Sequence, residues 1–122
     1  MPEITDVINT YIAAWNETDE AERLELVTRA WAPDATYVDP IMSGAGHEGI
    51  DAMIAAAQQQ FPEHRFELSF GPDAHNDNVR FAWQLYGPDG GEPVAAGADF
   101  GKLAGDGRLK AVTGFLEGQA AA

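Results

Sequence analysis

The sequence predicts an α+β domain in which three helices are followed by a curved, mostly antiparallel sheet. Apolar residues in the first half of the chain recur every three to four positions, which is the helical period. Those in the second half alternate with polar residues, which is the period of strands. Short glycine- and proline-rich segments separate the later runs as turns would. Helices first and hairpin-linked strands afterwards are typical of an α+β fold with an antiparallel sheet.

The first helix is predicted over residues 4–15, and Asn16 to Thr18 interrupt it. Its apolar stripe consists of Ile4, Val7, Ile8, Tyr11, Ile12 and Trp15. Asp19 and Glu22 have the spacing of a capping box that opens a second helix. The predicted inward face of this helix is Leu24, Val27 and Trp31, and the helix is expected to end at Pro33.

Residues 35–39 are predicted to form a short strand between Pro33 and Pro40. A glycine-rich turn follows, and then a third helix that ends before Pro62. Its predicted inward face is Ile50, Met53, Ile54, Ala57 and Phe61. The remaining strands are expected at residues 66–70, 79–86, 94–103 and 108–117.

Length and composition favour one domain over residues 1–122, with 118–122 as a flexible tail. The chain has 45% hydrophobic and 22% charged residues, as is ordinary for a globular protein. It has no cysteine, which excludes disulfides, thiol nucleophiles and thiolate metal sites.

The net charge is −13, from 20 acidic and 7 basic residues. Such a surface repels phosphate backbones and anionic lipids, so we expect neither nucleic acid nor a membrane as a partner. The first residues lack the features of a signal peptide, and no apolar stretch approaches the ~20 residues that span a bilayer. We therefore expect a cytoplasmic protein.

The order of elements and three local sequences resemble the nuclear-transport-factor-2-like (NTF2-like) superfamily, which includes SnoaL-type cyclases and ketosteroid isomerases. The local matches are ATYVDP at 35–40, HEGI at 47–50 and GRL at 107–109. The resemblance covers about residues 4–117. It implies a cone-shaped fold in which the helices and the curved sheet enclose a pocket for a small hydrophobic molecule. It also implies an activity without a cofactor.

Three polar residues match positions that carry chemistry in the isomerases. Asp39 precedes Pro40 at a strand end, where the resemblance implies the base that moves a proton next to a carbonyl; the alternative is a turn-forming aspartate. Tyr11 faces inward, where the resemblance implies a donor to the oxyanion; the alternative is a core tyrosine bonded to the backbone. Asp99 lies in a small, apolar strand and faces either solvent or the pocket, where burial would keep it protonated as a second donor.

The side chains expected to line the pocket come from the predicted helices and strands. They are Trp15, Trp31, Tyr37, Met53, Ile54, Arg80 and Trp83. Trp31 and Ile54 stand where the isomerases usually carry further tyrosines. If Arg80 faced inward it could pair with Asp99, and the site would then resemble an epoxide hydrolase; the alternative is a solvated Arg80.

Other sites are weakly indicated. Residues 44–49 match the dinucleotide-binding glycine pattern, but repeated βαβ units do not follow. His47 and Asp51 are the one helical pair with metal-ligand spacing, and they match no strong zinc pattern, so we expect neither cofactor nor metal.

Three functions stay open: an enzyme of isomerase or cyclase type, a non-catalytic binder of a small hydrophobic ligand, and a dimeric accessory module. We also expect a homodimer, because the strands carry aromatic residues on both faces.

Overall fold

The computed structural model describes residues 3–117, so the tail expected at 118–122 lies outside the described residues. The helices are α1 (Ile4–Asn16), α2 (Glu20–Ala30) and α3 (Gly46–Gln60). The strands are β1 (Trp31–Val38), β2 (Ser43–Ala45), β3 (Arg65–His75), β4 (Asn78–Tyr86), β5 (Ala95–Leu103) and β6 (Leu109–Leu116). The predicted order of three helices and a strand-rich second half is confirmed. The short strand β2 occupies what was expected to be only a turn.

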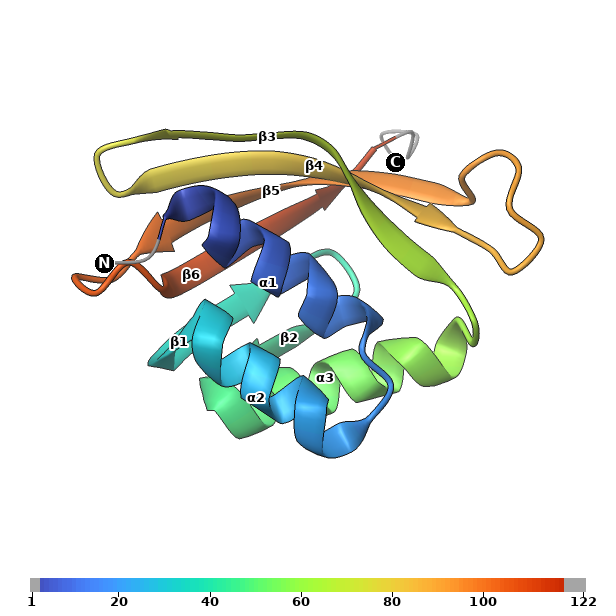
Figure 1. The fold of residues 1–122 in the computed structure, drawn as a ribbon, viewed down its shortest axis with the longest axis horizontal. Helices are drawn as coiled ribbons and strands as arrows, with labels where there is room; N and C mark the ends of the chain where they lie inside the picture. The colour runs from blue at the N-terminus through green and yellow to red at the C-terminus, as the bar shows by residue number, and fades with distance from the viewer. Residues whose placement is uncertain (1–2, 118–122) are drawn as a thin grey trace.

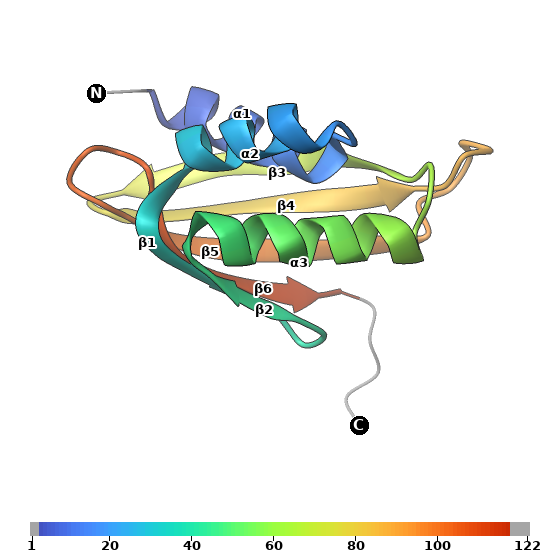
Figure 2. The same ribbon diagram turned by 90° about the horizontal axis from the view of Figure 1, so that it is seen from below.

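The six strands form one curved sheet in the order β2-β1-β6-β5-β4-β3. Every neighbouring pair is antiparallel except β1 and β6, which run parallel. The helices lie on one side of the sheet, which arches over α1 and curves down through β1 and β2 beside α3 (Figures 1 and 2). This arrangement confirms the α+β class with a mostly antiparallel sheet.

The core lies between the helices and the inner face of the sheet. The predicted stripe of α1 supplies Val7, Ile8, Tyr11 and Trp15, each at most 7% exposed. From α3 come Ile50 and Ile54, both fully buried. Each large apolar side chain of this kind contributes ~1.5–3 kcal/mol when it leaves water. The amphipathic pattern therefore fixes how α1 and α3 meet the sheet.

Helix α2 begins as predicted but differs in its inward face and its end. Asp19 caps it, because its Oδ2 accepts the backbone N–H of Glu22 at 2.9 Å. The helix ends at Ala30, and Trp31 begins β1. Pro33 fits into β1 because the pairing with β6 shifts register there, so its missing N–H costs no ladder bond.

Two expected inward residues are exposed. Leu24 in α2 is 39% exposed, and Phe61, just past the end of α3, is 42% exposed. On α2 the buried position is taken by Arg23, which is only 6% exposed. The expectation for Leu24 is wrong because α2 turns the neighbouring Arg23 towards polar partners on α3, which leaves Leu24 at the surface.

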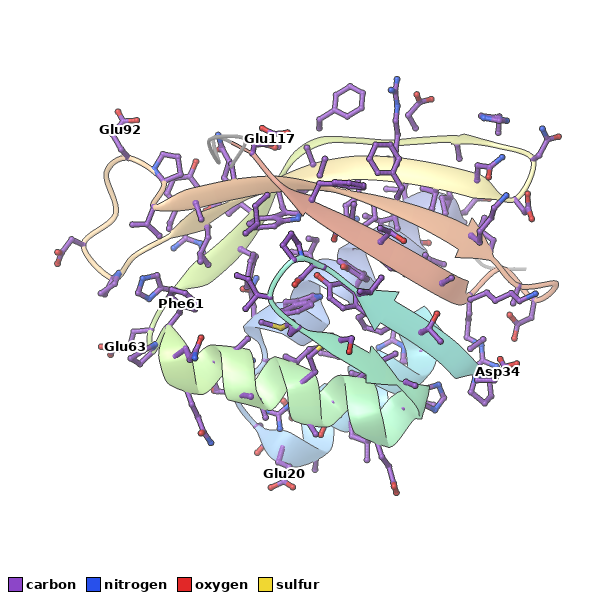
Figure 3. The ribbon with its side chains drawn as sticks, turned by 180° about the vertical axis from the view of Figure 1, so that it is seen from behind. Glu20, Asp34, Phe61, Glu63, Glu92 and Glu117 are labelled. Atoms are coloured by element: carbon purple, nitrogen blue, oxygen red, sulfur yellow. The ribbon has the colours of Figure 1, made fainter. Side chains whose placement is uncertain are left out.

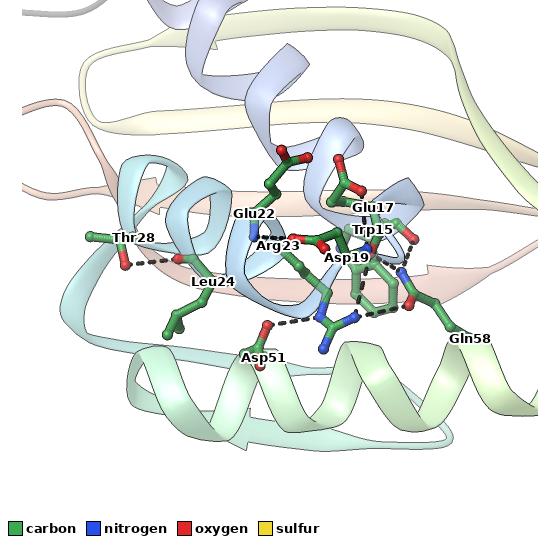
Figure 4. Close-up of polar contacts among 9 residues, drawn as sticks. All are labelled: Trp15, Glu17, Asp19, Glu22, Arg23, Leu24, Thr28, Asp51 and Gln58. Carbon is green, nitrogen blue, oxygen red and sulfur yellow. Dashed lines mark hydrogen bonds and ion pairs between the residues drawn. The ribbon is translucent and has the colours of Figure 1, made fainter.

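Those partners form a group that we call the Arg23 network: Arg23, Asp51 and Gln58 (Figure 4). Arg23 Nε donates to Asp51 Oδ1 at 2.8 Å, and Arg23 Nη1 donates to Gln58 Oε1 at 3.2 Å. Gln58 Nε2 in turn donates to the backbone carbonyls of Trp15 at 3.1 Å and Glu17 at 2.8 Å. The network thus ties the end of α1 to α2 and α3.

Candidate functional site

The centre of the site is Asp99, on the inner face of β5. Its side chain is 2% exposed, whereas acids such as Glu20, Asp34 and Glu92 project from the surface (Figure 3). Tyr11 Oη donates to Asp99 Oδ2 at 2.5 Å. Among the described residues no arginine, lysine or histidine forms an ion pair with this carboxyl group. Asp99 is therefore a buried acid that is hydrogen-bonded but has no cation beside it.

The second partner of Asp99 is Trp83 on β4, whose Nε1 donates to Asp99 Oδ1 at 3.1 Å. Trp83 lies opposite Gly97 in the β4–β5 pair. A Cβ atom on residue 97 would lie 2.3 Å from Cζ2 of the Trp83 ring. Only a glycine at this position leaves room for the indole ring to lie against β5 and reach Asp99.

A second glycine brings the other acid to the site. Gly114 on β6 is paired with Asp99. A Cβ atom at Gly114 would lie 2.9 Å from Asp99 Oδ1, 3.1 Å from Asp39 Cβ and 3.1 Å from Tyr37 Oη. Asp39, Tyr37 and Asp99 therefore meet over one point of β6. The absence of a side chain at Gly114 makes their approach possible.

Asp39 follows β1 and is half-buried. Its Oδ1 accepts the backbone N–H groups of Ile41 at 2.8 Å and Met42 at 2.9 Å, which is the turn-forming role that the sequence left open. Its Oδ2 accepts Tyr37 Oη at 2.6 Å. One oxygen of Asp39 thus holds the turn, and the other is joined to the site through Tyr37.

Burial dominates the electrostatics of the site. It raises the pKa of Asp99 to about 6, and the Asp39 carboxylate adds to the increase, while the hydrogen bonds from Tyr11 and Trp83 oppose it. Burial, followed by the charge of Asp99, also raises the pKa of both Tyr11 and Tyr37. The two phenols therefore stay protonated near neutral pH, whereas Asp99 gains and loses a proton there.

A cavity of about 20 Å³ lies beside Asp99. Its lining is Tyr11, Ile12, Trp15, Tyr37, Phe66, Trp83 and Asp99. A second cavity of about 20 Å³ lies between α3 and the sheet, and Trp15 and Phe66 line both. Each space is close to that of one water molecule. A larger molecule fits beside Asp99 only if side chains of the lining move.

A wider, open groove of about 510 Å³ runs along α3 away from Asp99. Met53 borders this groove, and Asp99, Tyr11 and Tyr37 do not. It is the roomier of these spaces, but it contains no acid or phenol. Asp99, Tyr11 and Tyr37 therefore lie at the small cavity and not at the groove.

Trp15, Tyr37 and Trp83 are the residues of the expected lining that surround the small cavity together with Tyr11 and Asp99. The others lie elsewhere. Trp31 and Ile54 are fully buried in the core and line neither small cavity.

Arg80 is on the outer face of β4, where its guanidinium pairs with Asp73 at 3.0 Å and its side chain is 57% exposed. The expectation that Arg80 lines the pocket is therefore not met, because the apolar residues of β4 face the core. The epoxide-hydrolase-like pair of Arg80 with Asp99 does not form.

Sequence reasoning missed four residues of the site. Ile12 and Phe66 line the cavity, and Gly97 and Gly114 give space to the polar groups. A glycine inside a strand often marks a close approach of another group, so both glycines carried a signal that strand periodicity alone does not use.

Within residues 3–117, histidine, aspartate and glutamate side chains do not gather in a group of three that could hold a metal ion. Over the same residues, no helix combines the length and the apolar character needed to cross a membrane.

Comparison with known proteins places this chain in a family. The model of the SnoaL-like domain matches residues 8–112. A candidate isomerase of the SnoaL-like family from Agrobacterium tumefaciens is 49% identical, covers 93% of this chain and 97% of its own, and superposes with a TM-score of 0.88. A comparison with curated proteins finds no match.

More distant structures support the fold alone. A candidate polyketide cyclase from Sinorhizobium meliloti is 22% identical with a TM-score of 0.69, covering 93% of this chain and 94% of its own. An NTF2-like protein of unknown function from an Exiguobacterium species is 15% identical with a TM-score of 0.72, covering 93% of this chain and 99% of its own. The fold is thus NTF2-like, and the family match over most of the sequence shows that the chain belongs to the SnoaL-like family.

Proposed function

We propose that this protein is a cofactor-independent enzyme that transfers a proton at a carbon next to a carbonyl group of a small hydrophobic molecule. The observation that carries the proposal is the meeting of two carboxyl groups over Gly114, each bonded to a tyrosine: Asp39 to Tyr37, and Asp99 to Tyr11. A pair of acids in different surroundings is the arrangement that separates the roles of base and acid. Here one acid is half-buried in a turn and the other lies deep in the core.

Asp39 is the proposed base. Its carboxylate takes the proton from the carbon next to the carbonyl group. The electron pair of the C–H bond forms a carbon–carbon double bond, and the π pair of the carbonyl group moves to the oxygen, which gives an enolate. Asp39 then gives a proton to another carbon, as in an isomerase, or the enolate carbon attacks a second carbonyl group, as in a cyclase, and the new alkoxide takes the proton from Asp39. Neither route needs an oxidant, a reductant or a cofactor.

Tyr11 is proposed to hold the oxygen directly, and Asp99 is proposed to act on it through Tyr11. When Asp99 is ionised it accepts the phenolic hydrogen of Tyr11, as the 2.5 Å contact describes. When Asp99 is protonated, the same contact can run in the opposite sense, and Asp99 donates to Tyr11. The phenolic hydrogen is then free for the enolate oxygen. A pKa of about 6 lets Asp99 take part in this exchange near neutral pH.

The name of the Agrobacterium relative, a candidate isomerase that is 49% identical, supports the same class of reaction. The test uses cyclic β,γ-unsaturated ketones of increasing size in D₂O. NMR measures how fast the proton next to their carbonyl group is exchanged for deuterium. Asp39→Asn should lower the exchange rate by ~10²–10⁴-fold. Tyr11→Phe should lower it by ~10²–10³-fold, as expected for the loss of one donor to the oxyanion.

The matched control is Asp73→Asn, which neutralises an exposed acid on the outer face of β3 and should leave the rate within about twofold. Saturable exchange that is equally fast in Asp39→Asn would contradict the assignment of the base. Saturable ligand binding without exchange on any ketone would favour the second candidate, a non-catalytic binder at the same cavity.

We further propose that the protein forms a homodimer through the outer face of the sheet. Large apolar side chains on this face are 47–54% exposed. They are Val38, Phe70, Phe100 and Phe115. Phe100 and Phe115 contact each other with ring centroids 5.8 Å apart. Light scattering should give twice the chain mass for the wild type and a monomer for Phe100→Ser with Phe115→Ser; a monomeric wild type would contradict the proposal.

A further inference from the structure

Trp15 and Trp31 carry indole N–H groups that are buried without a hydrogen-bond partner among the described residues. The chain has three tryptophans, and the third, Trp83, donates its N–H to Asp99. A buried N–H without a partner costs ~1–3 kcal/mol, and native proteins keep few of them. The two unpaired groups therefore need an explanation.

Their surroundings differ. Trp31 is packed in the core against the ring of Tyr11, with centroids 4.8 Å apart, and lines neither small cavity. Trp15 lines the cavity beside Asp99, together with Tyr11 and Tyr37. The Trp15 indole lowers the pKa of Tyr11, against burial and the charge of Asp99, so its N–H points towards the phenol oxygen without forming a regular hydrogen bond to it. Only the unpaired group of Trp15 is thus at the site.

The backbone at Trp15 is held from two sides. The Arg23 network reaches it through Gln58, whose Nε2 donates to the carbonyl of Trp15 (Figure 4). The next residue, Asn16, exchanges two hydrogen bonds with the backbone of Phe66, at 2.9 and 2.8 Å. These bonds fix the last turn of α1 against α3 and β3. The backbone of Trp15 is therefore set before a ligand binds, and only its side chain has to move to admit one.

We propose that Trp15 is a ligand-binding residue whose Nε1–H donates to the same ligand oxygen that Tyr11 contacts. This inference rests on the proposed function and specifies its ligand. An indole N–H can only donate, so the ligand must present an acceptor oxygen to it. Apart from Asp99 and the two phenol hydroxyls, the rest of the lining is aromatic or aliphatic, which favours a flat, apolar ring system behind that oxygen. Ring-bearing enolates and phenolates have this chemistry, and a hydrocarbon of the same shape leaves the N–H unpaired.

The first test is an NMR titration of protein labelled with ¹⁵N at its three indoles, using 2-naphthol and naphthalene as probes. Trp15→Phe and Trp31→Phe assign the signals. With 2-naphthol, the Trp15 indole proton should shift downfield as it gains a hydrogen bond, while the Trp31 proton stays nearly unchanged. Naphthalene should not cause the downfield shift of Trp15.

The second test separates the hydrogen bond from ring packing by measuring the affinity for both probes. In Trp15→Phe the affinity for 2-naphthol should fall at least about tenfold, which corresponds to ~1.4 kcal/mol. The affinity for naphthalene should fall less, so the ratio of the two affinities drops. Trp31→Phe removes the other unpaired N–H from the core and should leave the ratio within about twofold.

Equal losses for both probes, together with an unshifted Trp15 signal in the wild type, would mean that Trp15 only packs against the ligand. That result overturns the inference and leaves the proposed function standing, because proton exchange by Asp39 is measured separately. No binding of 2-naphthol to the wild type overturns the inference as well. If Trp15→Phe does not fold, Trp83→Phe replaces it for the assignment, and the shift in the wild-type spectrum decides.

Discussion

Two charged side chains are buried among residues 3–117, and their surroundings are opposite. Arg23, between α2 and α3, is 6% exposed and is met by the Asp51 carboxylate, the Gln58 amide oxygen and the carbonyl of Glu17. Asp99, on the inner face of β5, is 2% exposed, and within the described part of the chain its side chain is hydrogen-bonded only by the neutral donors of Tyr11 and Trp83. One buried charge is compensated and the other is not.

The difference separates structure from chemistry. A buried ion pair with further hydrogen bonds holds its elements together, and its charges have no reason to change. A buried acid without a cation is unstable in its ionised form, so its pKa rises towards neutrality and its proton becomes mobile. This contrast supports a structural role for the Arg23 network and the proposed role of Asp99 in the function.

The largest expected effect comes from breaking the compensated pair. Arg23→Leu leaves the Asp51 carboxylate without its cation and Gln58 without one partner. We expect the free energy of unfolding to fall by about 3–5 kcal/mol, measured by urea denaturation. Arg29→Leu removes an exposed arginine from the same helix and should cost less than ~1 kcal/mol. Similar losses in the two variants would contradict the structural role of the network.

The uncompensated acid should make stability depend on pH. The folded protein holds the Asp99 proton more tightly than the unfolded chain, because its pKa rises from 3.8 to about 6. Unfolding therefore releases a proton between these values, and the free energy of unfolding falls as the pH rises through this window. The fall attributable to Asp99 is roughly 3 kcal/mol.

This prediction is checked by comparing urea denaturation of the wild type and Asp99→Asn from pH 4 to pH 8. Other carboxyl groups titrate in both proteins, so the difference between the two curves isolates Asp99. The wild-type curve should fall relative to the variant as the pH rises. If the free energy of unfolding changes with pH in the same way in both proteins, burial does not raise the pKa of Asp99.

A smaller effect is expected from filling the space where the two acids meet. Gly114→Ala places a methyl group 2.9 Å from Asp99 Oδ1, so either the carboxyl group or the backbone must shift. We expect a loss of ~1–3 kcal/mol in stability and weaker 2-naphthol binding by the folded variant. In Gly105→Ala the new methyl group meets only open space, and stability should change by less than ~0.5 kcal/mol. Unchanged binding in Gly114→Ala would show that the ligand does not use the space at Gly114.

Much of the fold followed from local patterns. The stripe of α1 and the cap at Asp19 depend on residues a few positions apart, and both were predicted. The parallel pairing of β1 with β6 joins segments far apart in the sequence, such as Thr36 and Ala111, and no local pattern contains it. The same holds for Arg23, whose burial depends on Asp51 and Gln58 in another helix.

The candidate site divides in the same way. Tyr11 was singled out from a helical stripe, and Asp99 from a charge in an apolar strand. Their contact could not be predicted in this way, because they are 88 residues apart in the sequence. The two acids approach each other because Gly114 has no side chain, which becomes clear only once β5 and β6 are paired. The sequence did not show that Arg80 faces outward, because aromatic residues lie on both faces of the sheet.

The central claim is that Asp99 is a buried acid without a cation, whose proton is mobile near neutral pH. It is tested most directly by following the ¹³C signal of the Asp99 side-chain carboxyl group by NMR from pH 3 to pH 9, with Asp99→Asn used for assignment. The structure predicts a titration midpoint at a pKa of about 6, and a fall in this midpoint when Asp39→Asn removes the neighbouring charge. A midpoint at or below the ordinary aspartate value of 3.8, unchanged in Asp39→Asn, would contradict the account.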